Sequence, residues 1–210
     1  MAANRAPRRR LTPEVRRAEL LEHALAVFAR RGLGRAGHAE IANAAGVAVS
    51  TSFVYFPTRV ALMRAVLDEV AAFQTDLAVR AHSGDKPAPE KIREHVRAFA
   101  NAVDTHPDYA RVWLDLSTAI REDVWPQYLA FQDRILAIIG KTIERGKEEG
   151  EIASDVDADS EAWLIVGSAQ MLAQMKFTQF PADRLDRIVV DVWVEFSECG
   201  NGGPKCVHRL

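Results

Sequence analysis

The side chains best suited to chemistry gather in residues 47–59, VAVSTSFVYFPTR, where three consecutive hydroxyl residues precede an aromatic cluster. On a helix, the hydroxyls of residues 50–52 are able to exchange hydrogen bonds with base edges or phosphates. Tyr55 and Arg59 follow where a phenol and a guanidinium are able to grip phosphate. The pattern predicts a helix that reads nucleic acid, although an ordinary surface hairpin with Ser and Thr at its turns has a similar composition.

The stretch HAEIANAAGVAVSTSFVYF supplies the elements that would position these side chains. Ile41 and Ala42 are expected to face a core, and Gly46 takes a tight turn before a second short helix, which Pro57 ends. This is the organisation of a helix-turn-helix, whose second helix enters the major groove. The positions of that helix expected to return to the core are Val49, either Ser52 or Phe53, and Phe56.

The charge of the chain is strongly asymmetric. Residues 1–64 contain 11 Arg and 4 Glu, a net charge of +7, so the remainder of this chain of net charge −2 carries −9. A basic N-terminal part suits contact with polyanionic DNA. Arg8, Arg9 and Arg10 are expected either to enter the minor groove as an arm or to form a solvated, frayed terminus.

Apolar residues at helical spacing and Gly/Pro punctuation predict an all-α fold, with no alternating strand. No apolar run approaches the roughly 18 residues that span a bilayer, and no signal peptide is recognisable, so we expect a cytoplasmic protein. The first expected helix runs from Thr12 to Gly32, and two short helices follow at 38–45 and 49–56. The remaining expected helices are at 58–81, around 92–103, 107–116 and 125–143, and in a final pair at 157–177 and 181–198.

Several other functional classes are disfavoured. Gly32, Gly34 and Gly37 match G-x-G-x-x-G, but an amphipathic helix rather than a strand precedes them, so they indicate a helix stop and a connection. The sequence shows neither HExxH spacing nor a nucleophile elbow, and we expect no enzyme, cofactor or metal. Cys199 and Cys206 would bind a stray metal ion only together with His208, and free thiols in a tail are the simpler interpretation.

The stretch LEHALAVFARRGLGRAGHAEIANAAGVAVSTSFVYFPTRVAL resembles the DNA-binding domain of the TetR family of bacterial regulators. Within that family, FARRGLGRAGHAEIA, YFPTR and VWLDLSTAIREDVWPQY resemble the quorum-sensing master regulators of the HapR/SmcR type. The resemblance runs from about Arg5 to Phe196. It implies a homodimer, with three helices in each DNA-binding domain, six in each remaining domain, and an interface made by the last two helices of each subunit, about 157–198.

The resemblance also assigns site residues. The positions that contact DNA in the family are occupied here by Ser50, Thr51, Phe53, Tyr55, Thr58 and Arg59, with the arm Arg8, Arg9 and Arg10. His38 is also expected to contact DNA. This sequence departs from the family in two places. Ala48 replaces a usual Ser or Thr that would cap the reading helix, and Val54 replaces an Asn, so that it is limited to apolar contacts such as the thymine methyl group.

A ligand cavity is implied in the second domain, where a few polar groups stand among aromatic ones, as a site for a small, apolar effector requires. Its expected lining is Gln74, Leu77, Trp113, Tyr128, Gln132 and Met171, with Met175 also able to close it. Each of these residues taken singly fits an ordinary core equally well. Gly167, Ser168 and Ala169 would allow close approach of helices across a two-fold interface.

The sequence therefore predicts a DNA-binding domain at 1–57, an effector-binding and dimerisation domain at 58–198 and a tail at 199–210. The predicted function is a homodimeric, ligand-responsive transcriptional regulator of a pseudo-palindromic operator, either of the quorum-sensing type or a local metabolite- or drug-sensing repressor. From another class, an all-α adaptor module without sequence-specific DNA binding remains an alternative, because Ala48 and Val54 make the reading helix less polar.

Overall fold

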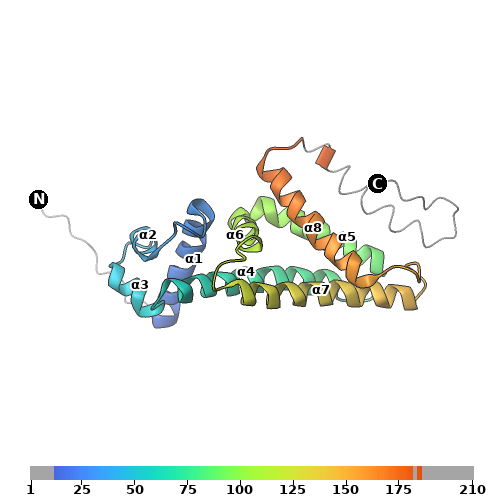
Figure 1. Ribbon diagram of the computed structural model, residues 1–210, viewed down its shortest axis with the longest axis horizontal. Helices are drawn as coiled ribbons and strands as arrows, with labels where there is room; N and C mark the ends of the chain where they lie inside the picture. The colour runs from blue at the N-terminus through green and yellow to red at the C-terminus, as the bar shows by residue number, and fades with distance from the viewer. Residues whose placement is uncertain (1–11, 182–183, 186–210) are drawn as a thin grey trace, which may run out of the picture. The chain divides into compact units, whose positions relative to one another are not determined.

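The computed structural model describes residues 12–181, 184 and 185 and confirms the all-α class. No strand occurs in this part of the chain, and its helices are those labelled in Figure 1. They are α1 (Pro13–Arg31), α2 (His38–Ala44), α3 (Val49–Tyr55), α4 (Arg59–His82), α5 (Ala88–Thr105), α6 (Pro107–Ser117), α7 (Trp125–Glu148) and α8 (Ala158–Phe177). Each lies where the periodicity predicted a helix, within a few residues at either end.

Local signals in the sequence set several of these boundaries. The Thr12 hydroxyl accepts a hydrogen bond from the backbone N–H of Val15 at 3.4 Å at the start of α1, and Gly32 ends α1 with φ of 76°. Gly46 adopts a φ of 64° between α2 and α3, a conformation that favours glycine. The Thr58 hydroxyl accepts from the N–H of Ala61 at 3.0 Å and so caps α4.

The chain divides into two compact units, an N-terminal unit ending at Val66 and a C-terminal unit beginning at Leu67. The division falls inside α4, two turns after the domain boundary that the sequence predicts at residue 57. The difference arises because Leu62, Met63 and Val66, at the start of α4, are buried side chains of the N-terminal unit. The helix therefore continues from one core into the next without a linker.

The N-terminal unit is built on a small apolar core. Phe28 from α1, Ile41 from α2 and Phe56 at the end of α3 are at most 2% exposed. Arg17 lies over the Phe56 ring, with its guanidinium carbon 5.2 Å from the ring centroid. These contacts hold α3 by its inner face and leave its outer face to solvent.

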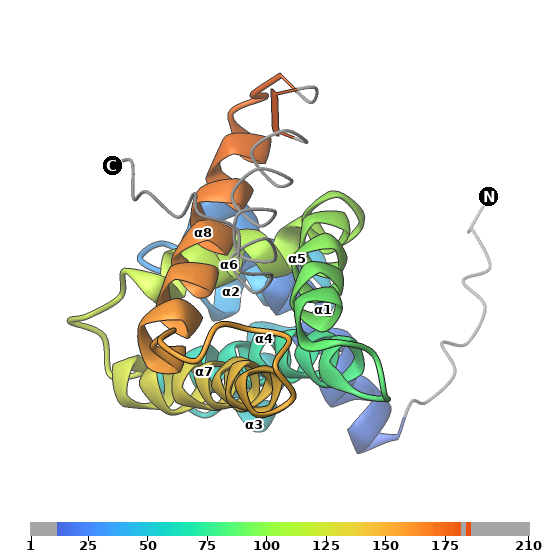
Figure 2. The same cartoon turned by 90° about the vertical axis from the view of Figure 1, so that its right-hand side faces the viewer.

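In the C-terminal unit, α4 and α7 run side by side in the same direction (Figure 1). The Gln127 amide donates to the Asp68 carboxylate at 2.5 Å, and fourteen or fifteen residues further along both helices His82 meets Thr142, so the helices are parallel. Figure 2 shows α5 and α8 on one side of this pair, and α5 packs against α6, α7 and α8. The space enclosed between these helices holds a cavity.

Several sequence predictions lie outside the described residues. They concern Arg8, Arg9 and Arg10, most of the expected ninth helix at 181–198, and Cys199, Cys206 and His208. Among the helices that the structure does describe, none combines the length and the apolar character needed to cross a bilayer.

Gly146 lies at a close crossing in the C-terminal unit. A Cβ atom at this position on α7 would lie 2.6 Å from the Cβ of Ala88 and 2.8 Å from the Cδ1 of Ile152. Gly140, on the same helix, has room, because its nearest foreign atom would be the Asp159 Oδ1 at 4.0 Å. The close approach of the start of α5 to α7 therefore requires glycine at 146 and not at 140.

We expect Gly146→Ala to lower the free energy of unfolding by about 1–3 kcal/mol, because the added methyl group overpacks the crossing. Gly140→Ala is the matched control and should be neutral or stabilising by up to about 1 kcal/mol, because alanine favours the helix. Urea unfolding of both variants at one protein concentration measures this. Equal midpoints for the two variants would contradict the packing described here.

Candidate nucleic-acid interface and effector cavity

The orientation of α3 is fixed by contacts from α2. His38, the first residue of α2, is 7% exposed, and its Nε2 atom lies 2.7 Å from the backbone carbonyl oxygen of Phe56. The His38 ring also stacks on the Phe53 ring, with centroids 4.0 Å apart and planes within 3°. His38, which is expected from the sequence to contact DNA, is therefore buried against Phe53 and the end of α3.

The hydroxyl residues of α3 lie on two different faces. Ser50 is exposed and Thr51 half-buried, whereas Ser52 is fully buried and its Oγ has no hydrogen-bond partner. The sequence left open whether Ser52 or Phe53 returns to the core, and the structure selects Ser52. Phe53 is 47% exposed and rests on the imidazole of His38.

The outer face of α3 also carries Val49, expected in the core but 43% exposed, and Val54, which is 75% exposed. Val54 is the most exposed large apolar residue of the described chain. Ala48 occupies the N-cap position of α3 without a side-chain hydrogen bond, as its methyl side chain dictates. The outer face of α3 therefore presents methyl groups beside hydroxyl groups.

The remaining residues expected at DNA flank the end of α3. Tyr55 is half-buried and Thr58 exposed, and both belong to the N-terminal unit. The Arg59 guanidinium donates a hydrogen bond to the backbone carbonyl of Leu33, which anchors the start of α4 to the segment between α1 and α2. In the same unit, Arg31 forms an ion pair with Glu40 at 2.8 Å.

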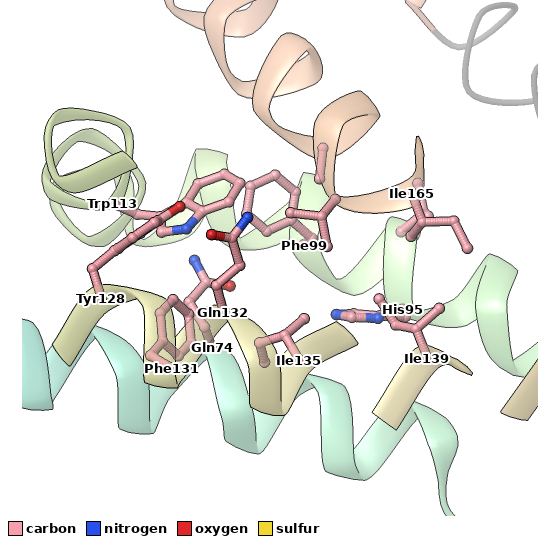
Figure 3. Close-up of a pocket in the computed structure, with 13 residues that line it drawn as sticks. Gln74, His95, Phe99, Trp113, Tyr128, Phe131, Gln132, Ile135, Ile139 and Ile165 are labelled. Carbon is pink, nitrogen blue, oxygen red and sulfur yellow. The ribbon is translucent and has the colours of Figure 1, made fainter. Parts of the chain in front are cut away.

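A cavity of about 40 Å³ lies within the C-terminal unit (Figure 3). Trp113, Tyr128, Gln74 and Gln132 gather at one end, and His95 lies at the other between Ile135 and Ile139. The full lining is Gln74, His95, Val96, Phe99, Trp113, Tyr128, Phe131, Gln132, Ile135, Ile139, Ile165, Val166 and Ala169. Apolar walls with polar groups at both ends are typical of a site for a small ligand.

The expected lining agrees with this cavity only in part. Gln74, Trp113, Tyr128 and Gln132 line it, whereas Leu77 and Met171 do not, and Met171 is 46% exposed on α8. Sequence reasoning missed His95 and Phe131. His95 follows Ile92 and precedes Val96 and Phe99 on the inward stripe of α5, so its position on a helical wheel would have identified it.

The polar groups of the cavity are neutral at pH 7. Burial raises the pKa of Tyr128 to about 12, and hydrogen bonds from Gln170 and Trp113 partly oppose that rise. Neither Lys nor Arg occurs among the described lining residues. The described residues also contain no group of three His, Cys, Asp or Glu side chains able to hold a metal ion.

Two histidines connect the cavity to α4 and α7. His82 Nε2 lies 3.1 Å from His95 Nδ1, and His82 Nδ1 lies 2.7 Å from the Thr142 hydroxyl oxygen. Burial lowers the pKa of His82 to about 3, with smaller effects from the charges of His95 and Lys91, and burial lowers the pKa of His95 to about 4. Both imidazoles are therefore uncharged at pH 7.

Comparison with known proteins gives two family matches and a curated relative. The family described as "Bacterial regulatory proteins, tetR family" matches residues 20–66, and "Tetracyclin repressor-like, C-terminal domain" matches residues 85–174. The HTH-type transcriptional regulator LuxR of Vibrio harveyi is 35% identical over 161 residues, which cover 77% of this chain and 78% of that protein.

Solved structures share the fold at lower identity. A TetR transcriptional regulator from Chloroflexus aurantiacus has a TM-score of 0.75 and 19% identity, covering 86% of this chain and 93% of its own. The regulator FadR from Bacillus subtilis, in complex with stearoyl-CoA, has a TM-score of 0.74 and 18% identity, covering 86% of this chain and 97% of its own.

The buried histidines should make stability fall with acid. Because the pKa of each ring is lower in the folded protein than the usual 6.5, the unfolded chain binds more protons below that pH, and folding loses free energy as pH falls from about 6.5 to about 4. The loss approaches about 1.4 kcal/mol per pH unit for each ring.

Urea unfolding between pH 7 and pH 4.5 measures this loss. We expect His95→Gln and His82→Gln to show a shallower fall than the wild type over that interval, whatever their stability at pH 7. Parallel pH profiles for the wild type and both variants would show that the rings do not resist protonation.

Proposed function

This chain belongs to the TetR family of transcriptional regulators, which bind DNA as homodimers, sense small molecules and are not enzymes, and from that premise we propose how its own residues act. The proposed function is a ligand-responsive regulator of a pseudo-palindromic operator. The observation that carries it is the division of α3 into a buried face, with Ser52 and Phe56, and an outer face that bears hydroxyl and methyl groups.

In this proposal the outer face of α3 reads base edges in the major groove. Ser50 and Thr51 supply hydroxyl groups that are able to donate and accept, and Val54 supplies methyl groups suited to thymine. Phe53 contributes its exposed ring edge while His38 supports its face. His38 itself is buried, so it acts through the position of α3 and Phe53.

Phosphate contacts would come from residues beside α3. Tyr55 and Thr58 offer hydroxyl groups. The Arg59 guanidinium donates to the neutral Leu33 carbonyl and pairs with no acidic side chain among the described residues, so its positive charge is available to a phosphate. The net charge of +7 over residues 1–64 favours approach to DNA, and Arg8, Arg9 and Arg10 would add contacts in the minor groove.

Dimerisation is proposed to use α8 together with the residues that follow it. Trp163, Leu164 and Met171 are 53%, 59% and 46% exposed, an unusual apolar stripe for a helix at the surface. Gly167 lies within this stripe, and a Cβ atom there would meet nothing within 4 Å. A second copy of α8 could therefore approach closely across a two-fold axis, as the sequence pattern suggested.

The effector is proposed to bind in the cavity between α4, α5, α6, α7 and α8 of the C-terminal unit. An apolar cavity of about 150 Å³ holds benzene, so one of about 40 Å³ accepts such a ligand only after its lining side chains move. The Bacillus subtilis regulator of similar fold is in complex with stearoyl-CoA, a ligand that includes a long apolar acyl chain. Gln74 places one wall of the cavity on α4 itself.

The need for rearrangement supplies the mechanism. A ligand that fits only an expanded cavity binds the expanded state more tightly and shifts the population toward it. If that state holds the two DNA-binding units of the dimer at a different separation, their fit to grooves about 34 Å apart changes. Such a regulator acts where the chromosome lies, so we propose the bacterial cytoplasm as its location.

The likeness to the Vibrio harveyi regulator favours a role like that of the quorum-sensing regulators over a local metabolite- or drug-sensing repressor. Genome-wide mapping of bound sites separates the two, since a global regulator occupies many promoters and a local one occupies few. An adaptor module without DNA recognition is the alternative if the wild-type protein shows no sequence preference in DNA binding.

We expect Thr51→Val to weaken binding to a preferred duplex by about 3- to 10-fold, because the variant keeps the shape of the side chain and removes one hydrogen bond. Ser52→Ala is the matched control one residue away. Since the Ser52 hydroxyl is buried without a partner, its removal should leave DNA affinity unchanged.

Fluorescence anisotropy against competitor DNA, at several salt concentrations, measures both variants. Unchanged affinity in Thr51→Val, or an equal loss in Ser52→Ala, would contradict the assignment of the outer face. Absence of any sequence preference in the wild type would leave the adaptor role.

We expect Leu164→Glu to weaken the dimer at least about 100-fold, because two-fold symmetry would bury an unpaired carboxylate in each subunit. Val79→Glu is the matched control, since Val79 is 51% exposed on α4, outside the proposed interface. Sedimentation equilibrium measures the mass of each. A dimer that persists equally in both variants would exclude the α8 surface.

A further inference from the structure

His95 is a polar group of the cavity that was not predicted from the sequence and that has no role in the proposed function. It stands at the end of the cavity opposite the two glutamines, between Ile135 and Ile139 (Figure 3). Its Nδ1 atom is turned to His82 on α4, at 3.1 Å. Because the two nitrogens of an imidazole point in nearly opposite directions, Nε2 is the atom left to face a ligand.

What Nε2 offers a ligand depends on where the ring carries its proton. Burial holds the pKa of His82 at about 3 and that of His95 at about 4, so each ring is neutral at pH 7. A neutral imidazole has one N–H donor and one acceptor nitrogen. The donor and acceptor sites of the two rings must therefore alternate along the chain of contacts.

Thr142 sets the direction of that alternation. Its hydroxyl donates to the Ile138 backbone carbonyl at 3.2 Å, and a carbonyl is only able to accept. Since the single hydroxyl proton is used there, the Thr142 oxygen accepts from His82 Nδ1–H at 2.7 Å. His82 Nε2 is then an acceptor, so His95 donates to it from Nδ1–H, and His95 Nε2 has no proton.

The reversed arrangement makes one hydrogen bond fewer. If Thr142 donated to His82 Nδ1, then His82 would donate from Nε2 to His95, and the Thr142–Ile138 bond would be lost. That arrangement would also leave the N–H of His95 without a protein acceptor in an apolar cavity, which is unfavourable. In the arrangement in which His82 donates to Thr142, no proton lies on His95 Nε2, and each side-chain N–H and O–H proton of these three residues has an acceptor.

We infer that His95 Nε2 is a hydrogen-bond acceptor at the apolar end of the cavity and selects an uncharged, largely apolar effector that carries a hydroxyl or N–H donor. This inference rests on the proposed function for the identity of the cavity as the effector site. A carboxylate ligand is disfavoured, because it would place its negative charge against a lone pair, with no Lys or Arg among the described lining residues.

The tautomer is tested first, on ligand-free, full-length protein at pH 7, by long-range ¹H–¹⁵N correlation spectra of the imidazole rings. The signals of His95 are identified by their loss in His95→Gln. We expect His95 and His82 both to carry the proton on Nδ1. A proton on His95 Nε2 overturns the inference, and since the measurement needs neither DNA nor effector, it leaves the proposed function standing.

Selectivity is tested with a matched pair of probes, indole and benzofuran, which share a shape but differ in that only indole has an N–H donor. Isothermal titration calorimetry should show indole binding about 5- to 10-fold more tightly, the effect of one hydrogen bond. The preference should vanish in His95→Leu and persist in Ile139→Val, a conservative change beside His95. Equal binding of both probes, or a preference that survives in His95→Leu, overturns the inference.

Thr142→Val provides a variant that leaves the cavity lining intact, because Thr142 is not part of it. Without the hydroxyl, the His82 Nδ1–H loses its acceptor, and the protons of both rings are free to reverse. We expect the preference for indole to fall to about 2-fold or less, with His95 gaining Nε2–H character in the spectra. An unchanged preference, or failure of the wild type to bind either probe, counts against the assigned ligand class and leaves operator binding untouched.

Discussion

The α4 helix is continuous and contributes side chains to the cores of both units of the chain. Over 24 residues this helix contributes Leu62 and Val66 to the core of the unit that holds α3, and then Val70 and Gln74 to the unit that holds the cavity. In the proposed function, Gln74 of the effector cavity therefore lies on the same helix as Leu62 and Val66 of the N-terminal core.

The cavity that we propose as the effector site is small and uncharged. In that proposal a ligand enters only by displacing the lining side chains, so the free energy of binding is tied to a change of structure. The contacts of His82 with His95 and Thr142 join α4 to α5 and α7 at one end of the C-terminal unit. Neutral rings in these contacts avoid burying an unpaired charge.

The sequence predicted the helices well because their ends are marked locally, by Thr12, by Gly46 and by Thr58. It did not decide between Ser52 and Phe53, since positions three and four residues after Val49 both fit the inner face of a helix. The His82–Thr142 contact joins residues 60 positions apart and follows only from packing. Met171 looked like cavity lining because an exposed apolar stripe and a core stripe on a helix have the same periodicity.

In the proposed function, the outer face of α3 reads DNA as one half of a symmetric pair. This is testable by selection of bound sequences from a pool of random duplexes, with the wild-type protein at near-physiological salt. We expect enrichment of an inverted repeat whose half-sites lie about 10 base pairs apart, which is one helical turn, or a multiple of that distance. Failure to enrich any sequence, or enrichment of a single motif without two-fold symmetry, would contradict it.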